Sequence, residues 1–250
     1  MSDSVFRNYI AGEWVDGNNQ NIDNISPADT KDNIGSYAQC DKAQTLAAIE
    51  AAKQGQLEWE KSGLEQRYSV LMAIGDELIA RKDELGELLA REEGKTKAEG
   101  VGETYRSGQF FHYYAAEVLR QMGETADSVR PGVEIETRRE PVGVVGIITP
   151  WNFPTATGAW KIAPALAYGN AVVWKPANQV PASAWALTEI ISRQNLPAGT
   201  VNLVMGPGSE VGDTLIHSKD INALTFTGSL ETGRKVAVAT AANLIKCQLE

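Results

Sequence analysis

Five short apolar runs in the C-terminal part of the chain constrain its fold more than any other feature. They read VGVVGIITP, NAVVWKP, VNLVMG, INALTFTG and LIKCQLE, and stretches of helical length separate them. Runs that are apolar on both faces and alternate with helices are typical of a parallel sheet covered on both sides. Residues 142–250 therefore predict an α/β fold with a doubly wound, five-stranded parallel sheet.

The part of the chain before these runs has other periodicities. Residues 8–15 predict a small hairpin, and from Asp41 apolar residues recur at three- and four-residue steps, with one further helix from about Ala98 to Gln121. Around residues 124–141 the period becomes two, which predicts an exposed antiparallel ribbon that protrudes from the body. We therefore divide the chain into a helical N-terminal part (1–123), a ribbon (124–141) and a five-stranded unit (142–250).

Composition excludes several classes of function. The 250 residues carry a net charge of −9, which disfavours a nucleic-acid surface because such a surface needs clustered Lys and Arg. No apolar run approaches the ~20 residues of a membrane span, and the start lacks a basic segment followed by an apolar one, so we expect a cytoplasmic protein. The two cysteines and two histidines are not grouped, which predicts no metal site.

Polar residues follow the first two predicted strands, where a doubly wound sheet binds its ligand. The first strand ends in TPWNFP, whose two prolines make a rigid loop around Trp151 and Asn152. An Asn amide held in such a loop can donate to a developing oxyanion. The second strand ends at Lys175, followed by Pro176. A lysine at this place is either a phosphate or ribose ligand or simply solvated.

Glycine-rich turns follow the third and fourth predicted strands. Residues 206–212, GPGSEVG, resemble a dinucleotide-binding fingerprint, but the final spacing differs and the turn follows the third strand rather than the first. In FTGSLETG, Gly228 and Gly233 flank Ser229, which we expect to open a helix whose N-terminus favours phosphate. Taken one by one, both turns are equally compatible with plain turns.

Taken together, the ordered set ITPWNFP, WKPA, FTGSxxxG and QLE closely resembles the aldehyde dehydrogenase superfamily. The segments YIAGEWV, REEGKT and KIAPALAYGNAVVWKPA fit the same family, so the resemblance extends from about residue 8 to residue 250. It implies a dinucleotide-binding domain of five parallel strands, a catalytic domain and an oligomerisation ribbon. This chain would supply the first, with part of the ribbon, and lack the catalytic domain with its nucleophilic Cys.

The resemblance also implies roles for single residues. Asn152 would be the side-chain donor of the oxyanion hole, Glu250 the general base that activates the deacylating water, and Lys161 would lie near the floor of the active site. The residues implied to line the cofactor cleft are Thr149, Pro150, Trp151, Lys175, Ala177, Asn178, Gly208, Gly212, Phe226, Thr227, Gly228, Ser229 and Gly233.

Cys247, three residues from Glu250, is either a nucleophile or a structural thiol. Strand alternation places Cys247 with Ile245 and Leu249 on one face, and Glu250 on the other. If Glu250 faces the site, Cys247 faces the core, so we expect a buried structural thiol. Cys40 lies in a loop-like segment, YAQCDKA, with no base nearby in the sequence.

The implied reaction is NAD(P)-dependent oxidation of an aldehyde to the carboxylate through a Cys thioester, with the chain alone inactive. Many NAD-preferring members have Glu three residues after the strand-end lysine; Asn178 stands there, so we expect NADP to be accepted alongside NAD. Trp160 replaces the Arg that often precedes the position of Lys161 in the succinic-semialdehyde branch. The segments APALAYGNAVV and LPAGTVNLVMGPGS look most like the bacterial α-ketoglutaric semialdehyde (2,5-dioxovalerate) dehydrogenases.

Three hypotheses follow for the chain as a whole. The first is the N-terminal portion of an aldehyde dehydrogenase, which forms a homo-oligomer if full length or combines with a complementing catalytic-domain chain. The second is a non-catalytic short protein that binds a nucleotide or a partner. The third is an inert fragment. The last two would leave apolar surface uncovered.

Overall fold

A computed structural model describes residues 5–120 and 122–250, and its main element is a mixed sheet of seven strands. The strand order is β12-β11-β8-β9-β10-β2-β3. Five neighbouring strands are parallel: β8 (Val144–Ile148), β9 (Ala171–Lys175), β10 (Val201–Leu203), β11 (Ala223–Phe226) and β12 (Lys246–Leu249). The predicted α/β fold with a parallel core is confirmed.

The N-terminal hairpin adds two strands to the five parallel strands that the sequence predicted. Strands β2 (Asn8–Ile10) and β3 (Glu13–Val15) form the predicted hairpin, and β2 pairs antiparallel with β10 through Tyr9 and Leu203. The Asn8 side chain accepts a hydrogen bond from the Met205 N–H at 2.7 Å. This partner lies almost 200 residues away in the chain, so local periodicity could not reveal it.

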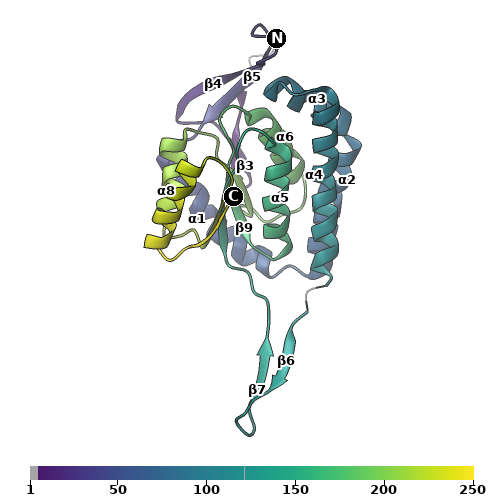
Figure 1. The fold of residues 1–250 in the computed structure, drawn as a ribbon, viewed down its shortest axis with the longest axis vertical. Helices are drawn as coiled ribbons and strands as arrows, with labels where there is room; N and C mark the ends of the chain where they lie inside the picture. Colours follow the sequence, from purple (N-terminus) through teal and green to yellow (C-terminus); the bar gives the residue numbers. More distant parts are fainter. Residues whose placement is uncertain (1–4, 121) are drawn as a thin grey trace.

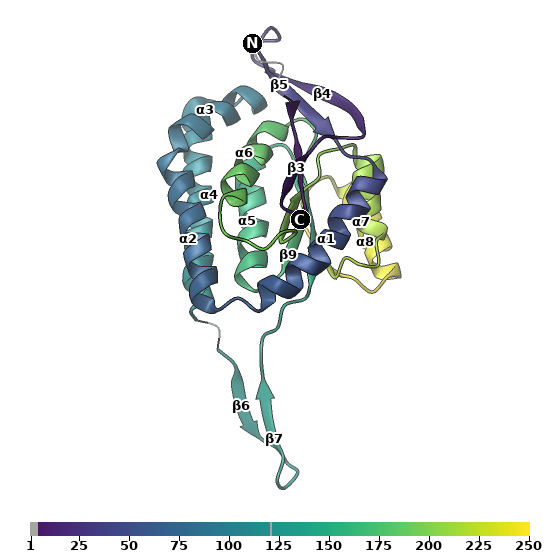
Figure 2. The same cartoon turned by 180° about the vertical axis from the view of Figure 1, so that it is seen from behind.

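Helices cover both faces of the sheet (Figures 1 and 2). Helix α1 (Lys42–Glu60) lies on one face with the shorter α7 (Asp213–His217) and with α8 (Leu230–Ala242). Helices α5 (Pro154–Ala167) and α6 (Pro181–Ser192) cover the other face. Outside them lie α2 (Leu64–Ala80), α3 (Lys82–Glu93) and α4 (Lys97–Val118). The predicted end of the last of these, Gln121, lies outside the described residues.

Two smaller sheets complete the described part of the fold. A three-stranded sheet contains β1 (Val5–Phe6), β5 (Asn33–Gln39) and β4 (Asn19–Ile25), none of which the sequence predicted. Strands β6 (Glu124–Asp127) and β7 (Glu134–Thr137) form the expected antiparallel ribbon, which extends away from the body (Figure 1). Every residue of both ribbon strands is exposed.

Cys40 lies in the short connection between β5 and α1, as the loop-like segment YAQCDKA indicated, and it is buried there. It directly follows β5, is fully buried, and its N–H donates to the Met205 carbonyl at 2.6 Å. Burial raises the pKa of the thiol to about 12. Cys40 is therefore a structural thiol of the core.

Candidate functional site

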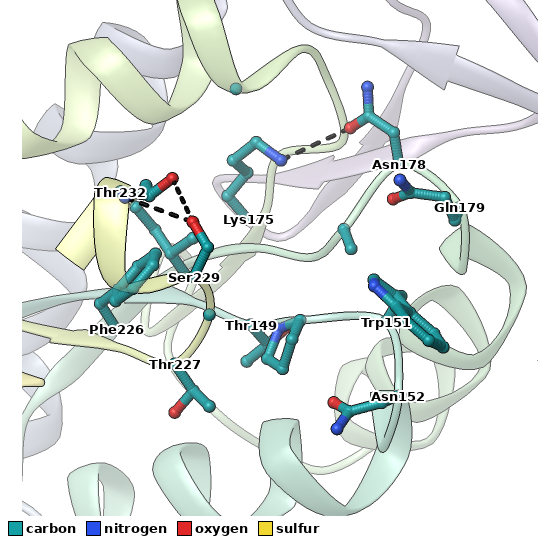
Figure 3. Close-up of a pocket in the computed structure, with 15 residues that line it drawn as sticks. Thr149, Trp151, Asn152, Lys175, Asn178, Gln179, Phe226, Thr227, Ser229 and Thr232 are labelled. Atoms are coloured by element: carbon teal, nitrogen blue, oxygen red, sulfur yellow. Dashed lines mark hydrogen bonds between the residues drawn. The ribbon is translucent and has the colours of Figure 1, made fainter. Parts of the chain in front are cut away.

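A cavity of about 640 Å³ opens beyond the carboxyl ends of the central strands. Strand register explains why the residues meet there, since Ile148 lies opposite Lys175 on one side and opposite Phe226 on the other. The cavity is lined by Ile148, Thr149, Pro150, Trp151, Asn152, Lys175, Ala177, Asn178, Gln179, Gly208, Phe226, Thr227, Gly228, Ser229 and Thr232 (Figure 3).

The first wall is the loop after β8. Its start is fixed because the Thr149 N–H donates to the Lys175 carbonyl at 3.2 Å and the Thr149 hydroxyl accepts from the Trp174 indole at 2.9 Å. Its end enters α5 at Pro154, a residue suited to the first turn of a helix. Between them Trp151 and Asn152 are exposed to the cavity, and the Asn152 amide makes no hydrogen bond to the described residues. That amide is free to donate to a ligand.

The second wall carries Lys175, whose side chain is buried at the end of β9. Burial lowers the pKa of its ammonium to about 8. The Nζ atom donates to the Pro176 carbonyl at 2.8 Å. It also donates to the Asn178 Oδ1 atom at 3.4 Å (Figure 3). No carboxylate of the described residues pairs with it, so the ammonium can donate to a ribose hydroxyl or a phosphate.

The third wall is the glycine-rich turn after β11. A Cβ atom at Gly228 would lie 2.6 Å from the Phe226 ring, so the close approach of the turn requires glycine. Ser229 caps α8 as predicted, with its hydroxyl accepting from the Thr232 N–H at 3.2 Å. The N-terminus of a helix carries partial positive charge and favours an anion.

Two of the predicted cofactor residues line adjacent cavities instead. Gly212 borders a cavity of about 360 Å³ that shares Lys175 and Gly208 with the main one. Gly233 borders another of about 370 Å³ next to Gly228. The sequence reasoning missed Ile148, Gln179 and Thr232, although Thr232 could have been found as the partner three residues beyond a helix-capping serine.

Glu250 lies at the margin of the cleft rather than in its lining. Its N–H donates to the Phe226 carbonyl at 3.0 Å, and its own carbonyl accepts from the Gly228 N–H at 3.1 Å. The carboxylate accepts from the Thr227 hydroxyl at 3.2 Å. The structure thus brings Glu250 beside Thr227, and Glu250 borders the adjacent cavity that Gly233 also lines.

Lys161 does not line the main cavity and instead contacts β11 and β12, at one edge of the main sheet. From α5 its Nζ atom donates to the Thr225 hydroxyl at 2.7 Å and to the Gln248 side chain at 3.1 Å. Burial lowers the pKa of this lysine, and the Glu250 carboxylate partly opposes the shift. Lys161 therefore ties α5 to β11 and β12, the two strands that carry Thr227 and Glu250.

The prediction that Cys247 is buried is wrong. The residue is exposed, as are all four residues of β12, because this strand lies at the sheet edge and, among residues 5–120 and 122–250, pairs with β11 alone. Alternation still separates Cys247 from Glu250, since side chains an odd number of positions apart point to opposite faces.

The described residues hold no cluster of three or more His, Cys, Asp or Glu side chains that could bind a metal ion. In the same part of the chain, no helix has both the length and the apolar character to cross a membrane.

A doubly wound sheet with a lysine, glycine-rich turns and a helix N-terminus around one cavity defines an α/β protein whose cleft suits a nucleotide. The sequence profile described as "Aldehyde dehydrogenase family" matches residues 14–250, and the chain belongs to this family. The resemblance that the motifs indicated is thereby confirmed.

Individual relatives agree with this assignment. The chain is 39% identical over 249 residues to the α-ketoglutaric semialdehyde dehydrogenase of Bacillus subtilis, covering 99% of this chain and 51% of that protein. It is 38% identical to the α-ketoglutarate semialdehyde dehydrogenase of Haloferax volcanii, covering 92% of this chain and 48% of that protein. The chain thus spans about half the length of these relatives.

Solved structures of the same family also match the fold over nearly the whole chain. The betaine aldehyde dehydrogenase of Staphylococcus aureus, solved in complex with NAD+, superposes with a TM-score of 0.95 at 35% identity. The match covers 98% of this chain and 49% of that one.

Proposed function

We propose that this chain is the cofactor-binding portion of an NAD(P)-dependent aldehyde dehydrogenase that oxidises an aldehyde to the carboxylate through a Cys thioester. The observation that carries the proposal is the convergence of loops after β8, β9 and β11 on one cavity. Twelve residues implied by the family resemblance line that cavity, from Thr149 in the first loop to Ser229 in the last.

The polar groups that line the cleft match the groups of a dinucleotide. The buried Lys175 ammonium and the Asn178 amide would bind the adenosine ribose, and the N-terminus of α8 at Ser229 would face the phosphates. When bound, this cofactor supplies the hydride acceptor. Asn178 is neutral and does not repel a 2′-phosphate, so the chain accepts NADP as well as NAD.

Two residues would assist the chemistry. The Asn152 amide would donate to the oxyanion that forms when a cysteine thiolate attacks the aldehyde. The Glu250 carboxylate would take a proton from the water that hydrolyses the thioester. The family nucleophile, a Cys in a Gly-Gln-x-Cys setting, does not occur in this sequence, so the thiolate would come from elsewhere.

We propose a semialdehyde such as α-ketoglutaric semialdehyde as the substrate. Support comes from the names of the two relatives above and from Trp160, which stands where the succinic-semialdehyde branch often has Arg. The exposed ribbon of β6 and β7 would join copies of the assembled enzyme, as in the family fold.

A second candidate, a non-catalytic protein that binds a partner, has one observation in its favour. Leu249 at the β12 edge and Leu230, Val238 and Leu244 near α8 are exposed. An apolar surface of this kind fits another polypeptide, and the complementing catalytic chain of the first proposal would use it too. Only that complementing chain would restore aldehyde oxidation.

Calorimetric titration with NADH and NADPH tests the proposal directly. The 250-residue chain is expected to bind both, with less than about tenfold preference, and to oxidise no aldehyde alone. A polypeptide with the Gly-Gln-x-Cys segment should restore NAD(P)H production. Failure to bind either nucleotide would refute the cofactor role, and turnover by the pure chain that Glu250→Gln abolishes would refute the predicted inactivity.

A further inference from the structure

A buried cluster of charged side chains contacts the loop that carries Asn152. Lys95, in the turn between α3 and α4, has a side chain only 11% exposed. Its Nζ atom lies 2.7 Å from Glu93 Oε2 and 2.7 Å from Glu103 Oε2, and the Glu103 side chain is 2% exposed. Removing charges from water is costly unless each one is paired, so this cluster needs all its partners in place.

The cluster binds the end of the loop after β8, where the loop enters α5. Lys95 Nζ donates to the Asn152 carbonyl at 3.0 Å and lies 4.3 Å from the centre of the Phe153 ring. Glu103 Oε1 accepts from the N–H groups of Thr155 and Ala156, both at 3.0 Å. One lysine and one glutamate therefore hold both the end of the loop and the first turn of α5.

The loop has little else to hold it there. Within the described part of the chain, the backbone of Pro150, Trp151 and Asn152 makes no other hydrogen bond outside the contact from Lys95. Trp151 is 54% exposed, so packing does not fix it either. The position of the Asn152 amide thus depends on a contact to its own main chain.

Glu92, three residues before Lys95, holds the neighbouring loop by the same chemistry. Its buried carboxylate accepts from the Ala182 N–H at 2.5 Å and from the Ser183 N–H at 2.9 Å, at the start of α6. The segment REEGK thus holds the start of α6 through Glu92 and the end of the loop before α5 through Lys95.

We propose that Lys95, together with Glu103, is a positioning pair that fixes the Trp151–Asn152 segment of the cleft wall and so aims the Asn152 amide. The proposal rests on the cofactor role of the cleft given above. Neither residue lines the cavity, so the pair acts through the loop and not by touching a ligand.

The test compares Lys95→Met with Lys97→Met. Lys97 lies two residues away with a side chain 62% exposed and pairs with Glu87 on the surface, so its substitution is the matched control. Each chain carries 5-fluorotryptophan, and the Trp151 signal in the ¹⁹F NMR spectrum is assigned by Trp151→Phe. The ligand-free Trp151 signal should shift or broaden in Lys95→Met and Glu103→Gln, while Trp59 and Trp174 in the core keep their signals.

Titration with NADH gives the second readout. Lys95→Met should weaken NADH binding about tenfold, the order expected when a charged donor to a positioned loop is lost. Lys95→Arg keeps the charge and should restore most of the affinity, and Lys97→Met should leave it unchanged. If Lys95→Met does not fold, Lys95→Gln, which keeps a donor without the charge, replaces it with the same expectations.

An unchanged Trp151 signal in both the Lys95 and Glu103 variants would overturn the proposal. So would a loss of all tryptophan signals together in every Lys95 variant, because it would show a purely structural role. If the unaltered chain binds no NADH, the cofactor role fails, but the ligand-free spectra still decide whether the pair positions the loop.

Discussion

The centre and the edge of the main sheet differ sharply in how they are supported. Every residue of β9 is buried, because the strand lies between β8 and β10 and helices cover both of its faces. Every residue of β12 is exposed, because within the described part of the chain that strand pairs with β11 alone. The same parallel ladder thus contains a fully enclosed strand and an open one.

This difference separates the two parts of the proposed site. Lys175 is the last residue of β9 and Thr149 follows β8, and their contacts are supplied by the described part of the chain. Glu250 follows the open strand and is held by two backbone hydrogen bonds and one long side-chain contact. Cofactor binding should therefore be robust in this chain, whereas the position of the base should be the easier to perturb.

The largest contrast is expected in stability. Trp174→Ala removes a fully buried ring and its hydrogen bond to Thr149, and should lower the free energy of unfolding by about 3–5 kcal/mol. Leu249→Ala on the open strand should cost under about 1 kcal/mol, since that side chain is 42% exposed. Urea denaturation of both variants measures the difference. Equal losses would mean that the edge is as well supported as the centre.

The next effect concerns the affinity for NADH. Lys175→Met should weaken NADH binding by about tenfold or more, because it removes a charge-assisted hydrogen bond, while Glu250→Gln at the edge should leave binding within about twofold. Fluorescence titration compares the two. A larger loss from Glu250→Gln would reverse the assignment of the cofactor site to the central strands.

The pH dependence of NADH binding also tests whether Lys175 on the central strand binds the cofactor. In the proposed site the protonated Lys175 ammonium would be the donor, and burial lowers its pKa to about 8 in the ligand-free cleft. Affinity should therefore be full below pH 8 and fall as the pH rises through that value, because the neutral amine binds phosphate or ribose less well. Lys175→Met should flatten this profile between about pH 7 and 9; a profile unchanged by the substitution would exclude Lys175 as its cause.

Cofactor choice should respond to a single carboxylate at the central site. Asn178→Glu should favour NADH over NADPH by about tenfold, since a carboxylate accepts from both ribose hydroxyls and repels a 2′-phosphate. Parallel titrations with the two nucleotides give the ratio, and Asn178→Gln is the neutral control. The same ratio in all three chains would show that this position does not face the ribose.

The smallest effect is expected for the exposed thiol. Cys247→Ser should change the free energy of unfolding by less than about 0.5 kcal/mol, because the residue packs against little. In the folded chain a thiol reagent should modify Cys247 quickly and Cys40 only on unfolding, since burial raises the pKa of Cys40 to about 12. Rapid reaction of both thiols would show that the core near Cys40 opens.

Strong local patterns made much of the fold and site predictable. The five parallel strands, the helix opened by Ser229 and the loops that carry Asn152 and Lys175 all follow from apolar runs and turn residues. Strand β4 was missed because its sequence, NQNIDNI, is largely polar. The Cys247 prediction was wrong because alternation gives the face of a residue, but not whether anything covers that face.

By itself, the sequence determined the five parallel strands of the main sheet, the residues at their ends and the family, because these depend on short-range periodicity and on local motifs. Only the tertiary structure decided that β2 joins β10, that Cys40 rather than Cys247 is buried, and that Lys95 holds the Asn152 carbonyl 57 residues away. These features depend on how distant segments pack, and no pattern within a single segment records its partner in space.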